Sequence, residues 1–396
     1  MERTSWTIRD VTVYGEDQIY EHGYVQVRDG RVQAIGKEDG SLVPEGEELT
    51  SGSGFVCVPG LIDVHIHGAA GADVMDATPE ALETIAGALP AEGTTSFLAT
   101  TMTLGPDAIE KALVNAGEYG SKQKADGKAE MLGIHLEGPF ISAEKAGAQP
   151  TKYIAEPDLG LFQKWQKGAG GRIRLVTLAP ECEGGLELIR YFTENNIVAS
   201  VGHSNAVYDE VVRAVEAGAS HVTHLYNGMR GLHHREPGVA GAALLLDELM
   251  AEVIVDGHHS RPEMVNLAYR QKGKDGLVLI TDAMRAKCLK NGTYDLGGQD
   301  VTVKDGEARL ESGSLAGSVL EMKDAIRNIM AYTGCSLADV VQMGAVNPAK
   351  ELNVYDRKGS LSPGKDADLV ILDQDLDVVM TICRGKVAYQ RDGVRS

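Results

Sequence analysis

The chain has 396 residues, of which 43% are hydrophobic and 24% are charged, an ordinary globular composition with room for one large domain and a smaller one. Its formal net charge of −19 disfavours binding to nucleic acid or to an anionic membrane surface. The five cysteines include no C-x-x-C pair, and neither a signal peptide nor a membrane-spanning run is evident, so we expect a cytoplasmic protein with reduced thiols.

Both ends of the chain are expected to form strands. Residues 6–15, 23–36 and 367–389 alternate apolar and polar side chains, and the last two segments each contain a turn dipeptide. The two turn dipeptides are Asp29-Gly30 and Arg384-Gly385. Because chain termini often lie close together, we expect residues 1–54 and 357–396 to combine into one small β-sandwich domain.

Residues 55–356 alternate short apolar runs with helical stretches, the pattern of βα units and a parallel sheet. The eight runs are 55–67, 94–101, 131–137, 173–180, 197–203, 219–226, 251–257 and 276–282. The helical stretches are 79–93, 106–122, 157–170, 185–196, 206–218, 240–250, 261–273 and, after a long loop, 320–334. Eight units predict a (β/α)₈ barrel, with a doubly wound open sheet as the alternative. That alternative usually has fewer strands, and no G-x-G-x-x-G motif follows the first run.

Histidines gather at the ends of these runs, and a barrel has its active site at the C-terminal ends of its strands. Eight of the eleven histidines are found there: His65, His67, His135, His203, His221, His224, His258 and His259. His65 and His67 are two residues apart, so in a strand both imidazoles project to the same side. One such pair alone is more often buried and hydrogen-bonded than metal-binding, but its grouping with the other histidines favours a metal site.

Individual members of this group differ in what they can do. His135 is either a ligand or a packing residue one layer below Glu137. His221 and His224 are three residues apart, so only one can point into the barrel, and we choose His224 because it is nearer the strand end. Imidazoles and carboxylates suit zinc or ferrous iron, which lowers the pKa of a bound water to about 7 and polarises a carbonyl. Asp282 is the candidate base, or else a cap for the segment that follows it.

The loop of residues 227–241 is a positive region in an acidic chain. It contains Arg230, His233, His234 and Arg235. An arginine offers a planar fork for a phosphate or a carboxylate, although a solvated loop would have the same composition.

Five segments at the ends of these apolar runs resemble the amidohydrolase superfamily: PGLIDVHIHG, HLEGPF, GH, THLYN and ITDAM. The blocks HLEGPF…KAGAQP and HLYNGM…HHREPG…GA resemble, more narrowly, its members that deacetylate N-acetylglucosamine 6-phosphate. The resemblance covers residues 8–390, including GKDADLVILD near the C-terminus. It implies a barrel with a small β-sandwich, a homodimer, and hydrolysis of the substrate's acetamide to glucosamine 6-phosphate and acetate.

The resemblance also implies roles for single residues. Glu137, His203 and His224 match the core metal ligands, His65 and His67 match a second-metal pair present in some members, and Asp282 matches the catalytic acid and base. The fourth run ends without the lysine that bridges two metals in many members, so Glu137 would have to bridge. The residues that match substrate and phosphate contacts are Ala148, Gln149, Asn227, Gly228, Arg235, His259, Leu315, Ala316 and Gly317. One or two ions per subunit are expected, zinc or iron first, with manganese or cobalt also compatible.

Three other functions remain open at this stage. Another amidohydrolase, such as an N-acyl-D-amino-acid deacylase, would share the metal ligands. A metal-free barrel isomerase or aldolase for sugar phosphates would leave the histidine-rich rim unexplained. A non-catalytic scaffold would have no reason to keep the ligands and the base together.

Overall fold

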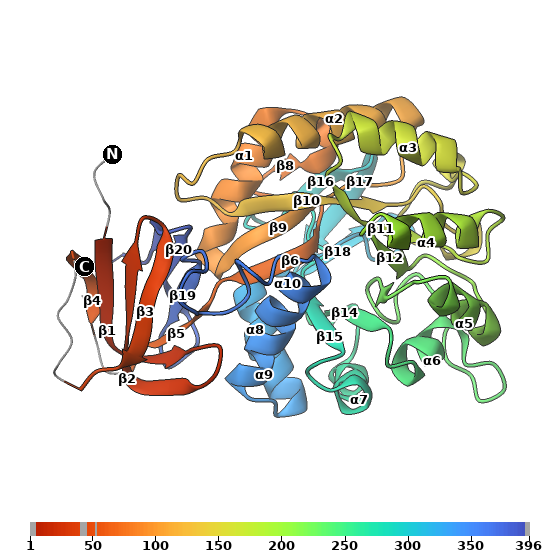
Figure 1. Cartoon of the computed structure of the whole chain (residues 1–396). Coiled ribbons are helices and arrows are strands. Elements are labelled where there is room, and N and C mark those ends of the chain that lie inside the picture. The colour runs from red at the N-terminus through yellow and green to blue at the C-terminus, as the bar shows by residue number, and fades with distance from the viewer. Residues whose placement is uncertain (1–4, 40–45, 52–53, 393–396) are drawn as a thin grey trace.

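The computed structural model describes residues 5–39, 46–51 and 54–392. A sheet of eight parallel strands surrounded by helices forms the larger part, and a second sheet drawn from both ends of the chain lies beside it (Figure 1). The predicted fold class, a barrel with a small β domain, is therefore confirmed.

The strands of the barrel follow one another in chain order. They are β6 (Leu61–Ile66), β9 (Thr94–Thr100), β10 (Glu130–Glu137), β11 (Ile173–Leu178), β12 (Val198–Val201), β13 (His221–Val222), β14 (Met250–Ile254) and β15 (Leu277–Ile280). Each of the eight predicted runs overlaps one of them, and β10 and β14 begin one residue before their runs. The chain just after β15 closes the ring, because the backbone N–H of Asp282 donates to the carbonyl of His65 at 2.8 Å. A backbone hydrogen bond thus joins two predicted site residues.

Helices surround these strands. They are α1 (Pro79–Ala88), α2 (Pro106–Lys122), α3 (Leu159–Gly168), α4 (Gly185–Glu194), α5 (Tyr208–Glu216), α6 (Gly238–Leu245), α7 (Pro262–Lys272) and α8 (Met322–Thr333), followed by the short α9 (Leu337–Val341) and α10 (Asn347–Glu351). α2 has the predicted bounds, and α6 ends five residues early. Nearly every α6 residue is buried, so no amphipathic pattern marks its end. Among the described residues, no helix is both long and apolar enough to cross a membrane.

The second sheet combines the two ends of the chain. Its strands are β1 (Ser5–Tyr14), β2 (Ile19–Arg28), β3 (Arg31–Lys37), β4 (Glu47–Ser51), β5 (Val56–Pro59), β19 (Leu369–Leu372), β20 (Val378–Cys383) and β21 (Lys386–Gln390). The predicted turns Asp29-Gly30 and Arg384-Gly385 join β2 to β3 and β20 to β21, with positive φ at both positions of each turn. The division at residues 54 and 356 stays a prediction.

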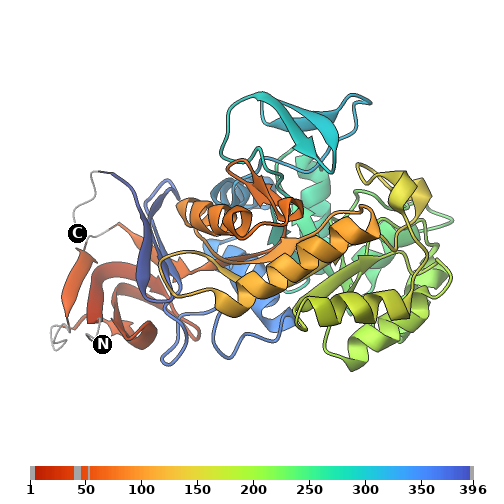
Figure 2. The same ribbon diagram turned by 90° about the horizontal axis from the view of Figure 1, so that it is seen from above.

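The long loop expected after the eighth run is a folded element instead. It forms a three-stranded antiparallel sheet of β16 (Gly292–Leu296), β17 (Gln299–Lys304) and β18 (Glu307–Leu310). Figure 2 shows this sheet, in cyan, standing out from one end of the barrel. It has a small apolar core of its own, in which Leu296 and Val301 pack with Met102 and Met284 of the barrel. The insertion thereby covers the barrel end where the strands finish.

Candidate active site

A pocket of about 270 Å³ opens at the C-terminal ends of the barrel strands. It is lined by twelve of the predicted site residues: His67, Glu137, Ala148, Gln149, His203, His224, Asn227, Gly228, His259, Asp282, Leu315 and Gly317. His65 lies fully buried against the carboxylates of this group. Ala316 packs into the core of the β16–β18 insertion, and Arg235 is exposed on its loop. The structure therefore brings most of the predicted set together and leaves Arg235 outside the pocket of its own chain.

Glu137, at the end of β10, is the centre of a first group of candidate ligands. Its Oε1 lies 3.2 Å from Nε2 of His203 and 3.3 Å from Nε2 of His224. The Nε2 atoms of these two histidines are 3.1 Å apart. Both histidines have positive φ, 46° and 31°, which is rare for a residue with a side chain and is found most often at functional sites.

His65, His67 and Asp282 form a second group next to the first. Oδ1 of Asp282 lies 3.4 Å from Nε2 of His65 and 3.3 Å from Nε2 of His67. Glu137 also faces this pair, with its Oε1 3.4 Å from His65 and its Oε2 3.3 Å from His67. Glu137 therefore stands between the two groups, as expected for the one carboxylate that could serve both.

The Nδ1 atoms of His65 and His203 form hydrogen bonds that face away from Glu137, and these bonds indicate that the two groups can bind a metal ion. Nδ1 of His65 faces Glu252 Oε2 at 2.9 Å, and Nδ1 of His203 faces the carbonyl of Lys145 at 2.8 Å. Both partners are acceptors, so each histidine carries a proton on Nδ1, and the neutral imidazole turns its Nε2 lone pair toward Glu137. Lone pairs facing carboxylate oxygens repel each other unless a cation lies between them. Tetrahedral zinc ligands also lie roughly 3.3 Å from one another, and the donor set fits such an ion.

The pKa values in the pocket point to the same charge requirement. Burial alone would lower the pKa of His67, but Asp282 and Glu137 outweigh burial and raise it to about 10. Burial would raise the pKa of Asp282, yet the neighbouring His65 and His67 lower it. The carboxylates thus stabilise positive charge at the centre of the group, which a divalent ion would supply.

Gln149 orients one of these carboxylates. Its Nε2 donates to Oε2 of Glu137 at 2.7 Å, and its Oε1 accepts the backbone N–H of Thr103 at 2.8 Å. Next to it, the carbonyl of Ala148 accepts a hydrogen bond from Gln299 of the β16–β18 insertion at 2.8 Å. Gln149 is therefore a partner of the predicted bridging carboxylate as well as a lining residue.

Positive charge is scarce in the rest of the pocket. None of the described residues that line it is a lysine or an arginine. His259 is the one histidine there outside the candidate ligands, and its Nδ1 lies 2.6 Å from Asp256 Oδ2. Burial alone would lower the pKa of His259, but Asp256 raises it overall, which favours the cationic imidazole.

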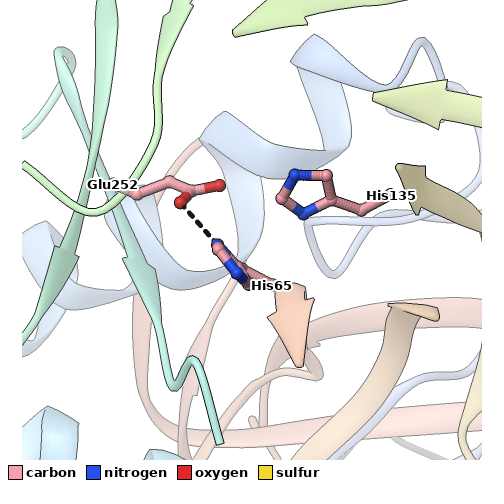
Figure 3. A group of neighbouring side chains, drawn as sticks. All are labelled: His65, His135 and Glu252. Atoms are coloured by element: carbon pink, nitrogen blue, oxygen red, sulfur yellow. Dashed lines mark hydrogen bonds and ion pairs between the residues drawn. The ribbon is translucent and has the colours of Figure 1, made fainter. Parts of the chain in front are cut away.

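The sequence interpretation missed Glu252, which is fully buried below the pocket. Figure 3 shows its carboxylate hydrogen-bonded to His65, with His135 beside the same imidazole. His135 uses its Nε2 on the hydroxyl of Thr177 at 2.7 Å and does not join the groups around Glu137. An isolated glutamate inside the apolar run 251–257 was the signal for Glu252, because a buried carboxylate requires partners.

Comparisons with known proteins agree with this site. The sequence profile of the amidohydrolase family matches residues 56–388. N-acetylglucosamine-6-phosphate deacetylase of Bacillus subtilis (strain 168) is 48% identical over 386 residues, which cover 97% of this chain and 97% of the relative. N-acetylgalactosamine-6-phosphate deacetylase of Escherichia coli O157:H7 is 38% identical, and 92% of this chain and 94% of that relative are covered.

A solved structure extends the likeness to the fold. It is the N-acetyl-D-glucosamine-6-phosphate deacetylase of Mycobacterium smegmatis, as an aspartate-to-alanine mutant in complex with N-acetyl-D-glucosamine-6-phosphate. The two chains are 31% identical, with a TM-score of 0.91 over 98% of this chain and 100% of that one.

Proposed function

This chain belongs to the amidohydrolase family, and from that premise we propose that it removes the acetyl group of N-acetyl-D-glucosamine 6-phosphate. The products are D-glucosamine 6-phosphate and acetate. One observation carries this proposal: Glu137, four histidines and Asp282 converge in a single pocket at the end of the barrel. Relatives of that activity cover nearly the whole chain, so the family likeness and the pocket support the same chemistry.

Each side chain of the pocket has a part in amide hydrolysis. Glu137, His203 and His224 would hold one divalent ion, and His65 with His67 would hold another, with Glu137 shared between them. When bound, such an ion polarises water and stabilises negative charge on the acetyl oxygen. Asp282 takes a proton from the attacking water and passes it to the leaving nitrogen. Zinc or iron fits these nitrogen and oxygen donors, and manganese and cobalt fit as well.

The pocket of one chain has few positive groups to bind the substrate's phosphate, so we propose that a second chain supplies one. His259, held by Asp256, supplies one positive group on the pocket wall. Arg235 is exposed on the segment of residues 227–237 that precedes α6, which also carries Leu232, 60% exposed. Leu245 at the end of the adjacent α6 is 59% exposed. These exposed apolar side chains support a homodimer in which Arg235 reaches the phosphate in the partner's pocket.

The remaining predicted contacts also line the pocket. We assign contacts with the sugar ring and its hydroxyl groups to Ala148, Asn227, Gly228, Leu315 and Gly317, because they share the pocket with the candidate ligands. Gln149 would divide its amide hydrogens between Glu137 and the substrate. All five cysteines are free thiols in the structure, which supports a reducing, cytoplasmic location.

The test is acetate release by purified protein, measured together with its metal content. We expect acetate and free amine in equal amounts from N-acetylglucosamine 6-phosphate, loss of the reaction on chelation, and its return with Zn²⁺ or Fe²⁺. N-acetylgalactosamine 6-phosphate is the necessary comparison, because one relative is named for that substrate. Metal-loaded protein that releases no acetate from the glucosamine compound contradicts the proposal, and a faster reaction with the galactosamine compound reassigns the sugar.

A further inference from the structure

Glu252 on β14 receives hydrogen bonds from three histidine residues below the pocket. Its Oε2 accepts from Nδ1 of His65 at 2.9 Å and from the backbone N–H of His224 at 3.0 Å. Its Oε1 accepts from Nε2 of His221 at 3.1 Å. The other nitrogen of His221 lies 2.8 Å from Glu351 Oε1, an ionic contact that lacks the geometry of a hydrogen bond. Glu252 is thus held in one orientation by groups on both of its oxygens.

This orientation decides which nitrogen of His65 is free. A carboxylate can only accept, so the proton of His65 stays on Nδ1. In the neutral imidazole, Nε2 then presents its lone pair 3.4 Å from Oε1 of Glu137 and 3.4 Å from Oδ1 of Asp282, and it has no hydrogen bond to any described residue. With no acceptor at Nδ1, the proton could move to Nε2 and bond to these carboxylates, which would block a metal ion.

We propose that Glu252 is a positioning residue for the His65–His67 metal site. It does not line the pocket, and it acts by fixing the tautomer and the ring orientation of His65. The link to catalysis rests on the proposed function, because it assumes that a metal ion at this site serves deacetylation. The link to metal binding does not.

Packing alone does not explain the contact, as the other neighbour of His65 shows. His135 lies against the same ring, with the two ring centroids 4.5 Å apart. Its hydrogen bond goes to Thr177, and none joins it to His65, so His135 packs against His65 without holding its proton (Figure 3). A change at His135 therefore serves as a matched control, because His135 is equally buried and contacts the same ring.

Glu252 also contacts the Glu137–His203–His224 group, but in a different way. It binds the backbone of His224 and leaves that imidazole untouched, whereas it binds the imidazole of His65 directly. Loss of the carboxylate should therefore weaken the His65–His67 site far more than the Glu137–His203–His224 site.

Titration of the metal-free protein with Co²⁺, followed by visible absorption and elemental analysis, tests the proposal. We expect two binding phases in the wild type and loss of one phase in His65→Ala. Glu252→Leu should weaken that same phase by roughly 10- to 100-fold, the usual effect of removing such a partner. Glu252→Gln keeps an oxygen for His65, so it should retain both phases. His135→Leu should retain both as well.

Several results would overturn the proposal. They are an unchanged titration in Glu252→Leu, an equal loss of both phases, a loss in Glu252→Gln as large as in Glu252→Leu, or the same loss in His135→Leu. Should Glu252→Leu fail to fold, NMR of the imidazole N–H protons of the zinc-loaded wild type decides. The signal absent from His65→Ala must belong to an Nδ1–H, and an Nε2–H assignment refutes the proposal. If the wild type binds both ions but releases no acetate, only the proposed function fails.

Discussion

His203, His224 and Asp282 share a backbone conformation that few side chains adopt. Their φ angles are 46°, 31° and 48°, all in the left-handed region. Each residue stands just after the end of its barrel strand, where a sharp turn aims the side chain into the pocket. Such strain persists only where the surrounding structure imposes it, and it is typical of active sites. Asparagine tolerates this region well, which makes Asp282→Asn a clean removal of charge.

We expect Asp282→Asn to lower kcat by roughly 10²–10⁴-fold, the usual scale for a positioned acid and base. Its amide cannot accept the proton of the attacking water at neutral pH. Metal content and substrate binding should stay close to the wild type, because Glu137 and the four histidines are intact. Steady-state kinetics with elemental analysis of the same preparation measures both. An unchanged kcat would assign the base to another group.

Glu137→Gln should remove most of the bound metal and most of the activity. The two oxygens of Glu137 face four imidazoles. Glutamine replaces one of these oxygens with an NH₂ group, which donates hydrogen bonds and cannot bind a metal ion. His65→Ala should cost only one ion and part of the rate. Metal content per chain checks both variants, and full occupancy in Glu137→Gln would refute the ligand assignment.

The two ends of one strand can have different roles, and in β10 one end lies in the active site while the other stabilises the fold. It ends at Glu137 in the pocket and begins at Glu130 on the opposite side of the barrel. Glu130 accepts two hydrogen bonds from Arg357 at 2.9 Å each and an ion pair from the buried Lys358 at 2.8 Å. Lys358 also pairs with Asp368 just before β19, so this cluster joins the barrel to the sheet formed by the chain ends.

Glu130→Gln should destabilise the protein at neutral pH and do so less in acid. Burial alone would raise the pKa of Glu130, but Arg357 and Lys358 lower it from 4.5 to about 2. A lowered folded-state pKa contributes stability above the unfolded pKa, and this contribution is lost as pH falls toward 2. The lowered pKa corresponds to a contribution of about 3 kcal/mol to the free energy of unfolding at pH 7.

Urea unfolding of the wild type and Glu130→Gln at pH 7, 5 and 3 measures this effect. The difference in unfolding free energy between the two proteins should become smaller from pH 5 to pH 3. Glu118→Gln is the control, because Glu118 forms an exposed pair with Lys122 that should contribute no more than about 0.5 kcal/mol. A difference that stays constant with pH would contradict the prediction.

The same elements show how far the sequence could predict the fold and the site. Strong periodic runs located the eight barrel strands, and strand-end histidines located the pocket. The β16–β18 insertion was missed although Gly297-Gly298 and Asp305-Gly306 join its strands. A short sheet with one exposed face has too few apolar positions to stand out from a loop. Glu252 was missed because its role depends on His65, which lies 187 positions away in the sequence and becomes a neighbour only in the closed barrel.

At the scale of the whole molecule, an acidic protein has to hold an anionic substrate. The chain carries a net charge of −19, and the described lining of the pocket contains neither lysine nor arginine. Of the predicted basic loop 227–241, residues 238–241 belong to α6 and residues 231–235 lie at the surface, with Arg235 hydrogen-bonded to its neighbour His234 at 2.8 Å. Symmetric pairing of two chains would bring such a loop to a partner's pocket without changing the charge of either chain.

Arg235→Ala should therefore weaken recognition of the substrate's phosphate and leave the other substrate contacts intact. A charge-assisted contact contributes about 1.5–3 kcal/mol, so kcat/KM for N-acetylglucosamine 6-phosphate should fall by roughly 10- to 100-fold. The slow reaction with unphosphorylated N-acetylglucosamine should hardly change, because the sugar and the acetamide keep their contacts. Equal losses with both substrates would make Arg235 a structural residue.

Mixed dimers then show which chain supplies the arginine. If Arg235 serves the partner's pocket, a dimer of one Asp282→Asn chain and one Arg235→Ala chain contains one site with both groups intact. Random pairing makes half of the dimers mixed, so about a quarter of the wild-type sites should be restored. Coexpression with two affinity tags isolates the mixed dimer, and each variant paired with itself gives the baseline. Activity no higher than the mean of the two parents would place Arg235 in its own chain's site, because every pocket would then lack either its base or its arginine.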